Sequence, residues 1–242
     1  PAQTTYAIES GSTDSVQFVF FDSALSLRTQ PSAWRPALDS LEKILLNSKD
    51  RAGITWRVFC AHHPFYSVGE HAGYSAWNDE TNTVDYLPRC DKDSNAYAWF
   101  QNSLDPEDLC TDKYKQYVDS VKAVIHSAGV RVQLAIAGHD HSLQLLSYPE
   151  RNSDVPEFPR VQVVSGAGSK PARVKFSSPP FEYTSAQTDL KKEGESYPGF
   201  VQLQFEKEKL RIKFFNAKGG DWLDMGGGRK EFWLDIHGTL LN

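Results

Sequence analysis

The first third of the chain has the pattern of a strand, a helix and a second strand. Residues 16–22 and 55–61 are short apolar runs bounded by polar residues or glycine, which is typical of buried strands. Residues 33–47 lie between them and carry apolar side chains at helical spacing. Two strands joined by a helix form a βαβ unit in a sheet covered by helices. We therefore expect a covered α/β sheet.

The sequence pattern of the remaining residues predicts one long loop, one more helix and a series of strands. Residues 62–110 show no period, and their many aromatic side chains favour an ordered functional loop. A second amphipathic helix is expected to end at Gly129, and a third buried strand spans residues 132–137. Strand-like alternation then recurs between Pro-, Gly- and Ser-rich turns, at residues 142–148, 160–164, 199–205, 210–215 and 231–236.

Charge and hydropathy exclude two broad classes of protein. The formal net charge is −5 and the isoelectric point is about 5.8, whereas a nucleic-acid-binding protein normally has a basic face. No run of eighteen or more consecutive apolar residues is present, so no membrane-spanning helix is expected. We therefore expect neither a nucleic acid nor a membrane as a partner.

The three cysteines and the first residues bear on compartment and processing. Cys60 lies in an apolar run and is expected to be a small buried residue. Cys90 and Cys110 flank a loop-like stretch, but spacing alone leaves a disulfide between them open. Such a disulfide would place the protein in an oxidising compartment. The sequence starts at Pro1 without a signal-peptide pattern, which fits a processed, truncated or split chain.

Two short segments at strand ends hold the histidines that predict chemistry. Residues 61–71 contain His62, His63 and His71, and residues 138–141 have the pattern Gly-His-Asp-His. Each segment directly follows a buried strand, and open α/β sheets bind ligands at the carboxyl ends of their strands. Neutral imidazole is the commonest metal ligand. Alternate residues of an extended backbone face the same way, so His139 and His141 are expected to point into one space and Asp140 elsewhere, which favours a metal site.

Other interpretations of the histidines were compared with a metal site. His126 lies in a predicted helix and His237 in the terminal strand, and both fit ordinary structural roles. A Ser-His-Asp hydrolase is disfavoured because the chain has no Gly-x-Ser-x-Gly motif. The cysteine spacing of a structural zinc site is also missing.

Three consecutive motifs resemble those of the purple acid phosphatases, within the calcineurin-like metallophosphoesterases. They are His-His-Pro-Phe-Tyr-Ser with a following Glu-His at residues 62–71, Gly-His-Asp-His-Ser-Leu-Gln at 138–144, and Val-Ser-Gly-Ala-Gly at 164–168. The resemblance runs from about residue 16 to 170. It implies an α/β fold, namely half of a four-layer α/β/β/α sandwich. Residues 16–170 would form its motif-bearing core, and residues 171–242 a β-rich tail of the same domain.

The resemblance also implies roles for the histidines. His62 and His139 would bind one metal ion, and His141 would bind a second. His71 would bind the substrate phosphate or act as a general acid, with His63 also on the substrate side. The implied protein is a dinuclear acid-phosphatase-like phosphomonoesterase, secreted or periplasmic, with iron and a second ion of zinc, manganese or iron.

The family's N-terminal motifs have no counterpart in this chain. Asp-x-His or Asp-x-Gly, Gly-Asp-x-x-Asp/Tyr and Gly-Asn-His are all missing, and Asp22 fits a structural role better than a ligand role. In the family these motifs supply the bridging carboxylate and most ligands of the first metal. We therefore expect an N-terminal half of the same precursor, or a separate chain, to complete the site. The same component is expected to cover the strand at residues 16–22, which otherwise has no obvious neighbour. Alone, this chain is expected to bind metal weakly and to be inactive.

Two rival functions remain open at the level of sequence. One is a degenerate phosphoesterase that keeps the fold and serves as a binding or scaffold protein. The other is a mononuclear module in which His62, His139 and His141 bind zinc. The number of bound ions discriminates the mononuclear module from the dinuclear enzyme. The substrate, the metal identities and the choice between monoesters and diesters are not set by the sequence.

Overall fold

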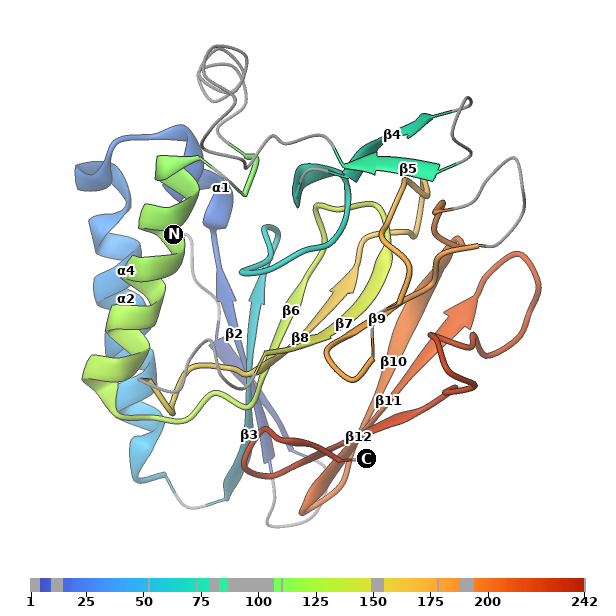
Figure 1. Cartoon of the computed structure of the whole chain (residues 1–242). Coiled ribbons are helices and arrows are strands. Elements are labelled where there is room, and N and C mark those ends of the chain that lie inside the picture. Colours follow the sequence, from blue (N-terminus) through green and yellow to red (C-terminus); the bar gives the residue numbers. More distant parts are fainter. Residues whose placement is uncertain are drawn as a thin grey trace.

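The computed structural model describes residues 5–9, 15–51, 53–72, 74–78, 83–86, 107–109, 111–148, 155–177, 179–187 and 194–241. Three layers are formed by these residues (Figure 1). Helices cover one face of a seven-stranded sheet, and a four-stranded sheet packs against its other face. The mixed α/β architecture expected from the sequence is confirmed. A second helical layer is not found among the described residues.

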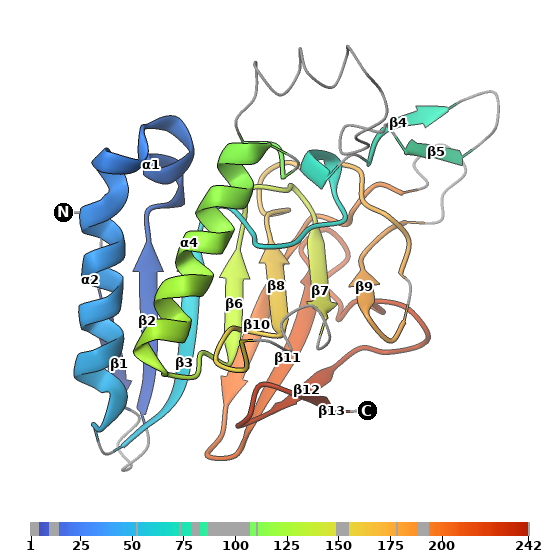
Figure 2. The same cartoon turned by 60° about the vertical axis from the view of Figure 1, so that its left-hand side comes forward.

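The large sheet has the order β1-β2-β3-β6-β8-β7-β9 (Figure 2). Its strands span Thr5–Glu9 (β1), Ser15–Phe21 (β2), Ile54–Ala61 (β3), Leu134–Ala137 (β6), Leu143–Ser147 (β7), Val161–Ser165 (β8) and Glu182–Thr184 (β9). β2, β3, β6 and β8 run parallel, whereas β1, β7 and β9 pair antiparallel with their neighbours. The predicted βαβ unit is present as β2, α2 and β3.

The smaller sheet contains β10 (Gly199–Phe205), β11 (Lys209–Asn216), β12 (Phe232–Asp235) and β13 (Leu240–Leu241). All of its neighbouring strands are antiparallel. A separate hairpin of β4 (Tyr74–Asn78) and β5 (Thr83–Tyr86) follows a short 3₁₀ helix, η1 (Glu70–Ala72). The stretch expected to be one long loop therefore contains these elements in its first part.

The helices begin and end at recognisable capping residues. Asp22 caps α1 (Ser23–Arg28), because its carboxylate accepts the Leu25 N–H at 3.0 Å, which fits the structural role expected for it. Thr111 caps α4 (Asp112–Ala128) by accepting the Tyr114 N–H. Gly129 ends α4 at a left-handed φ of 58°, as predicted. α2 (Pro31–Lys49) has proline in its first turn.

Two apolar cores lie on the opposite faces of the large sheet. One face packs against the helices, through Phe21 and Phe59 on the sheet and Leu41 and Tyr117 on α2 and α4. The other face packs against the smaller sheet and includes Trp56. Because both faces are buried, the strands are almost continuously apolar, as the runs in the sequence indicated. None of the described helices combines the length and the apolar character needed to cross a bilayer.

The edge of the large sheet and the cysteines were also the subject of expectations from the sequence. The strand at residues 16–22 was expected to lack a neighbour within this chain, and that was wrong, because β1 pairs with it along five residues. Hydrophobic alternation did not reveal β1, since it is short and lies outside the motif-bearing region. Cys60 is a partly buried free thiol. Cys90 and Cys110 lie outside the described residues, so their pairing stays a prediction.

Candidate metal centre

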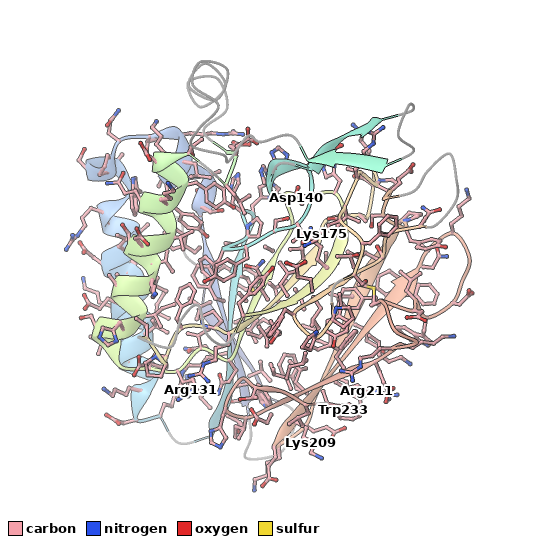
Figure 3. All side chains as sticks on the ribbon, viewed as in Figure 1. Arg131, Asp140, Lys175, Lys209, Arg211 and Trp233 are labelled. Atoms are coloured by element: carbon pink, nitrogen blue, oxygen red, sulfur yellow. The ribbon has the colours of Figure 1, made fainter. Side chains whose placement is uncertain are left out.

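The two histidine segments lie side by side at the carboxyl ends of neighbouring parallel strands. β3 and β6 pair with Cys60 opposite Ile136, which brings the residues that follow them together. The backbone N–H of Gly138 donates to the carbonyl of His62 at 3.1 Å, so contact between the segments continues past the strand ends. This is the edge at which open α/β sheets bind ligands. In Figure 3 the labelled Asp140, from the second segment, marks this end of the sheet.

The second segment is bent, not extended. His139 has a φ of 59° and is the one described non-glycine residue with a positive φ. Histidine is among the residues enriched in this left-handed region. The expectation that His139 and His141 point into one space was therefore wrong, because it assumed that residues 138–141 are extended. The bend buries the His139 ring beside the first segment and leaves the His141 side chain exposed.

Three imidazoles meet where the segments touch. The ring centroids are 4.8 Å apart for His62 and His63, 5.2 Å for His62 and His139, and 4.3 Å for His63 and His139. One nitrogen from each ring lies within 4.8 Å of the other two. Nitrogen ligands bind zinc at about 2.0–2.1 Å, which places two ligands of a tetrahedral ion about 3.4 Å apart. Small movements of the side chains would thus bring this group to metal-binding geometry.

The protonation states of these rings also fit a cation. Burial, together with the charges of neighbouring histidines, lowers the pKa of His139 to about 2 and that of His63 to about 4. Burial also lowers the pKa of the more exposed His62. All three rings are therefore neutral near pH 7 and have a lone pair to offer.

His63 has a buried ring nitrogen without a hydrogen-bond partner. Its side chain is 1% exposed, and its Nδ1 lies 2.9 Å from the hydroxyl of Ser23 at the start of α1. The opposite nitrogen, Nε2, is buried without a hydrogen-bond partner. Buried polar atoms normally have partners, so an orphan atom beside two other imidazoles calls for an explanation. A metal ion bound to Nε2, with Nδ1 oriented by Ser23, supplies one. The sequence had assigned His63 to substrate, and that role stays a prediction.

Glu107 faces the same group and the adjacent Asp108 contacts His71, and the sequence did not single out either residue. The Glu107 carboxylate lies 3.7 Å from His63 Nε2, and its other oxygen accepts the Arg28 guanidinium at 2.6 Å. Burial alone would raise the pKa of Glu107, but Arg28 and His63 hold it below its usual value. Both acidic residues lie within residues 62–110, which show no hydrophobic period. The only signal for them in the sequence is that two carboxylates are adjacent.

His71, the expected general acid, lies next to the three imidazoles. Its ring centroid is 3.9 Å from that of His139, and 29% of its side chain is exposed. Its Nδ1 lies 3.1 Å from the buried carboxylate of Asp108, which fixes the orientation of the ring. The partly exposed ring can therefore reach both the metal-binding group and a substrate. Its catalytic role stays a prediction.

A buried polar network positions the loop that carries His71. The Asp140 carboxylate is 1% exposed, accepts the His71 N–H at 3.0 Å and accepts the Ser67 hydroxyl. Gln144, on β7, accepts the Val68 N–H and also contacts Ser67. The residue between the two histidines of Gly-His-Asp-His therefore has a structural task.

His141, the third expected ligand, is not part of the three-imidazole group. Its side chain is exposed, although it lies near enough to His62 for its charge to lower the pKa of that residue. Its assignment as a ligand of a second ion stays a prediction. A shallow pocket of about 410 Å³ opens next to His62 at the ends of β2, β3 and β6, and includes Phe20, Cys60 and Ile136. Burial raises the pKa of the Cys60 thiol to about 12, so this group is not a nucleophile near neutral pH.

In sequence, the chain matches no known family and no curated protein. In structure, it resembles GAP50, the anchor in the inner membrane complex of Plasmodium, with a TM-score of 0.53 at 14% identity. The match covers 92% of this chain and 52% of GAP50. The chain shares its α/β fold with GAP50.

A second similar structure is that of PhoD, with a TM-score of 0.49 at 13% identity, covering 98% of this chain and 43% of PhoD. The chain thus spans about half the length of these two structures. At 14% identity, its relation to GAP50 is one of fold.

Proposed function

We propose that this chain supplies the histidine side of the metal centre of an acid-phosphatase-like enzyme that hydrolyses phosphomonoesters. The observation that carries the proposal is the group of His62, His63 and His139, in which His63 Nε2 is buried without a partner. These three residues would hold the ion, and His141 stays the predicted ligand of a second one. When bound, such ions polarise the phosphoryl oxygens and activate water.

His71 has the position needed to act on the leaving group. Its ring contacts His139, is oriented by Asp108 and remains partly exposed. A histidine in this place can donate a proton to the departing oxygen or bind the phosphate directly. The hydrogen bond from its backbone to Asp140 keeps the ring at this distance from the three imidazoles.

The proposal includes a second component that completes the centre. Three imidazoles fall short of the ligands that two ions need, and iron and manganese sites commonly include carboxylates. The missing carboxylates would come from an N-terminal segment of the same precursor or from a separate chain. The pocket beside His62 has an apolar lining and lies at the edge of the centre, where such a segment would pack. An oxidising compartment, secreted or periplasmic, remains part of this proposal.

Two other functions have specific support. The likeness to GAP50, which is described as an anchor, favours a scaffold that keeps the fold without activity. The meeting of three imidazoles at one point favours a mononuclear metal-binding module. One ion per assembled protein would support the mononuclear module, two would support the phosphatase, and none would support the scaffold.

Binding of the reaction product to the chain itself tests the enzymatic proposal. The metal-free chain is loaded with Co²⁺, inorganic phosphate is added, and the width of the phosphorus NMR line is measured. We expect paramagnetic broadening in the wild type and in His126→Ala, a variant of an exposed histidine, and loss of it in His139→Ala. Absence of broadening in the wild type, or equal broadening in His139→Ala, would contradict the proposal.

Activity is then measured on the assembled protein. The chain is purified together with the component that completes it and loaded with zinc, manganese or iron. Release of phosphate from p-nitrophenyl phosphate should depend on metal and disappear in His139→Ala. A two-ion assembly without metal-dependent phosphate release would favour the scaffold.

A further inference from the structure

Glu107 has its two carboxylate oxygens in different environments. Oε1 accepts the guanidinium of Arg28, at the end of α1, at 2.6 Å. Oε2 lies 3.7 Å from His63 Nε2, which is too far for a hydrogen bond. The side chain is 18% exposed, so bulk water does not surround it. Oε1 is thus held by Arg28, while Oε2 lies on the side of His63.

The facing nitrogen has no hydrogen-bond partner of its own. His63 Nδ1 is engaged by the Ser23 hydroxyl at 2.9 Å, whereas Nε2 is buried and unpaired. When Nδ1 carries the proton, a lone pair on Nε2 faces the anionic oxygen of Glu107. Two electron-rich atoms that face each other in a partly buried place repel, unless a cation lies between them. Nitrogen and oxygen ligands of a tetrahedral zinc ion lie about 3.4 Å apart, close to the observed 3.7 Å.

The main chain of Glu107 also contacts the group. Its carbonyl oxygen lies 3.2 Å from His139 Nε2. With the proton on Nε2, His139 donates to this carbonyl and keeps Nδ1 for a metal ion. Metal-bound histidines commonly donate their second N–H to a carbonyl or a carboxylate, and this bond fixes the tautomer. Glu107 thus approaches two of the imidazoles, one through its side chain and one through its main chain.

We infer that the Glu107 carboxylate is the oxygen ligand of the ion that His62, His63 and His139 bind. The inference rests on the metal binding in the proposed function and adds a ligand to it. Three imidazoles and one carboxylate suit a borderline divalent ion such as zinc, which can expand to five ligands when a phosphate binds. Glu107 thereby provides a carboxylate that the histidine motifs at residues 62–71 and 138–144 do not supply. Arg28 acts as a positioning residue that directs Oε2 toward His63.

Titration of the metal-free full chain with Co²⁺ tests this inference without an activity assay. Visible absorption reports the geometry around cobalt, and the titration gives the affinity. We expect wild-type protein to bind one Co²⁺ at this site with an intense tetrahedral spectrum. Glu107→Gln should bind it at least about 10-fold more weakly, with an altered spectrum, because even outer ligands change affinity by 10–100-fold.

Two variants distinguish ligation from simple structural support. Glu157→Gln removes a carboxylate that lies 3.3 Å from the exposed His126, and it should keep the wild-type spectrum and affinity. Arg28→Ala removes the tether and keeps the Glu107 carboxylate, so the tetrahedral spectrum should persist. Circular dichroism verifies that each variant is folded.

The possible outcomes separate this inference from the proposed function. If wild-type protein binds no Co²⁺, the proposed metal centre itself is wrong. If the wild type binds Co²⁺ and Glu107→Gln shows the same spectrum and affinity, the centre stands and ligation by Glu107 is overturned. Weaker binding and a changed spectrum in Glu107→Gln alone support ligation.

Discussion

The backbone N–H of His71 donates to the buried carboxylate of Asp140 at 3.0 Å. This bond joins the loop after β3 to the segment after β6, and the Ser67 hydroxyl donates to the same carboxylate. Asp140 therefore sets where the His71 ring stands relative to His139, whose centroid is 3.9 Å away. This arrangement requires the main chain at Gly166 to lie close to the Asp140 carbonyl oxygen.

Gly166 permits that approach, and Gly168 in the same motif serves as a matched control. A Cβ atom at Gly166 would lie 1.9 Å from the Asp140 carbonyl oxygen, whereas one at Gly168 would meet nothing within 4 Å. We expect Gly166→Ala to lower the free energy of unfolding by about 1–3 kcal/mol or more. Gly168→Ala should leave it nearly unchanged. Urea denaturation measures both, and equal effects would show that Asp140 does not pack against Gly166 as described.

His71→Ala should lower turnover of alkyl phosphates by about 10²–10⁴-fold in the assembled enzyme, the usual range for loss of a general acid. Turnover of nitrophenyl phosphate should fall less, because its leaving group barely needs a proton. Asp108→Asn should change both rates in the same direction but less, since it only loosens the orientation of His71. Bound metal, measured by elemental analysis, should not change in either variant. Equal losses for good and poor leaving groups would reject the acid role.

The metal-free protein should lose stability as the pH falls below about 6.5. In the unfolded chain His139 binds a proton near that pH, whereas burial keeps its folded pKa at about 2. The unfolded state therefore binds more protons between these values. Stability falls by up to about 1.4 kcal/mol per pH unit for this residue. Above about pH 6.5 the effect vanishes, because both states are neutral.

Urea denaturation in EDTA at pH 7.5, 6.0 and 5.0 measures this dependence. Carboxylates and other histidines also contribute to the slope, so the comparison is with His139→Gln, which cannot titrate. The variant should show a shallower loss of stability between pH 6.0 and 5.0. Identical slopes would mean that His139 is not buried and neutral in the folded protein.

The fold could be predicted from sequence wherever one physical pattern dominated. The apolar runs at residues 16–22 and 55–61 and the helix between them became β2, β3 and α2, because burial on both faces leaves little ambiguity. Gly129 ended its helix as expected, since glycine adopts a left-handed φ easily. β1 and β9 were missed because they are only five and three residues long, too short to show a clear period.

The site was only partly predictable. His62 and His139 meet because they follow neighbouring parallel strands, which their positions in the sequence indicated. The bend at His139 was not foreseeable, because a positive φ at a non-glycine residue depends on tertiary packing around Asp140. Glu107 reaches the same place from a segment without period, more than thirty residues away from either histidine. Long-range contacts of this kind leave no local pattern.

The central claim is that His62, His63 and His139 together hold a metal ion. Crystals of the full chain grown with zinc, with anomalous diffraction recorded at the zinc edge, test it most directly. We predict an anomalous peak within about 2.0–2.1 Å of one nitrogen of each of the three imidazoles. A well-diffracting crystal grown with zinc that shows no peak there, or shows zinc only at exposed histidines such as His126, would contradict the claim.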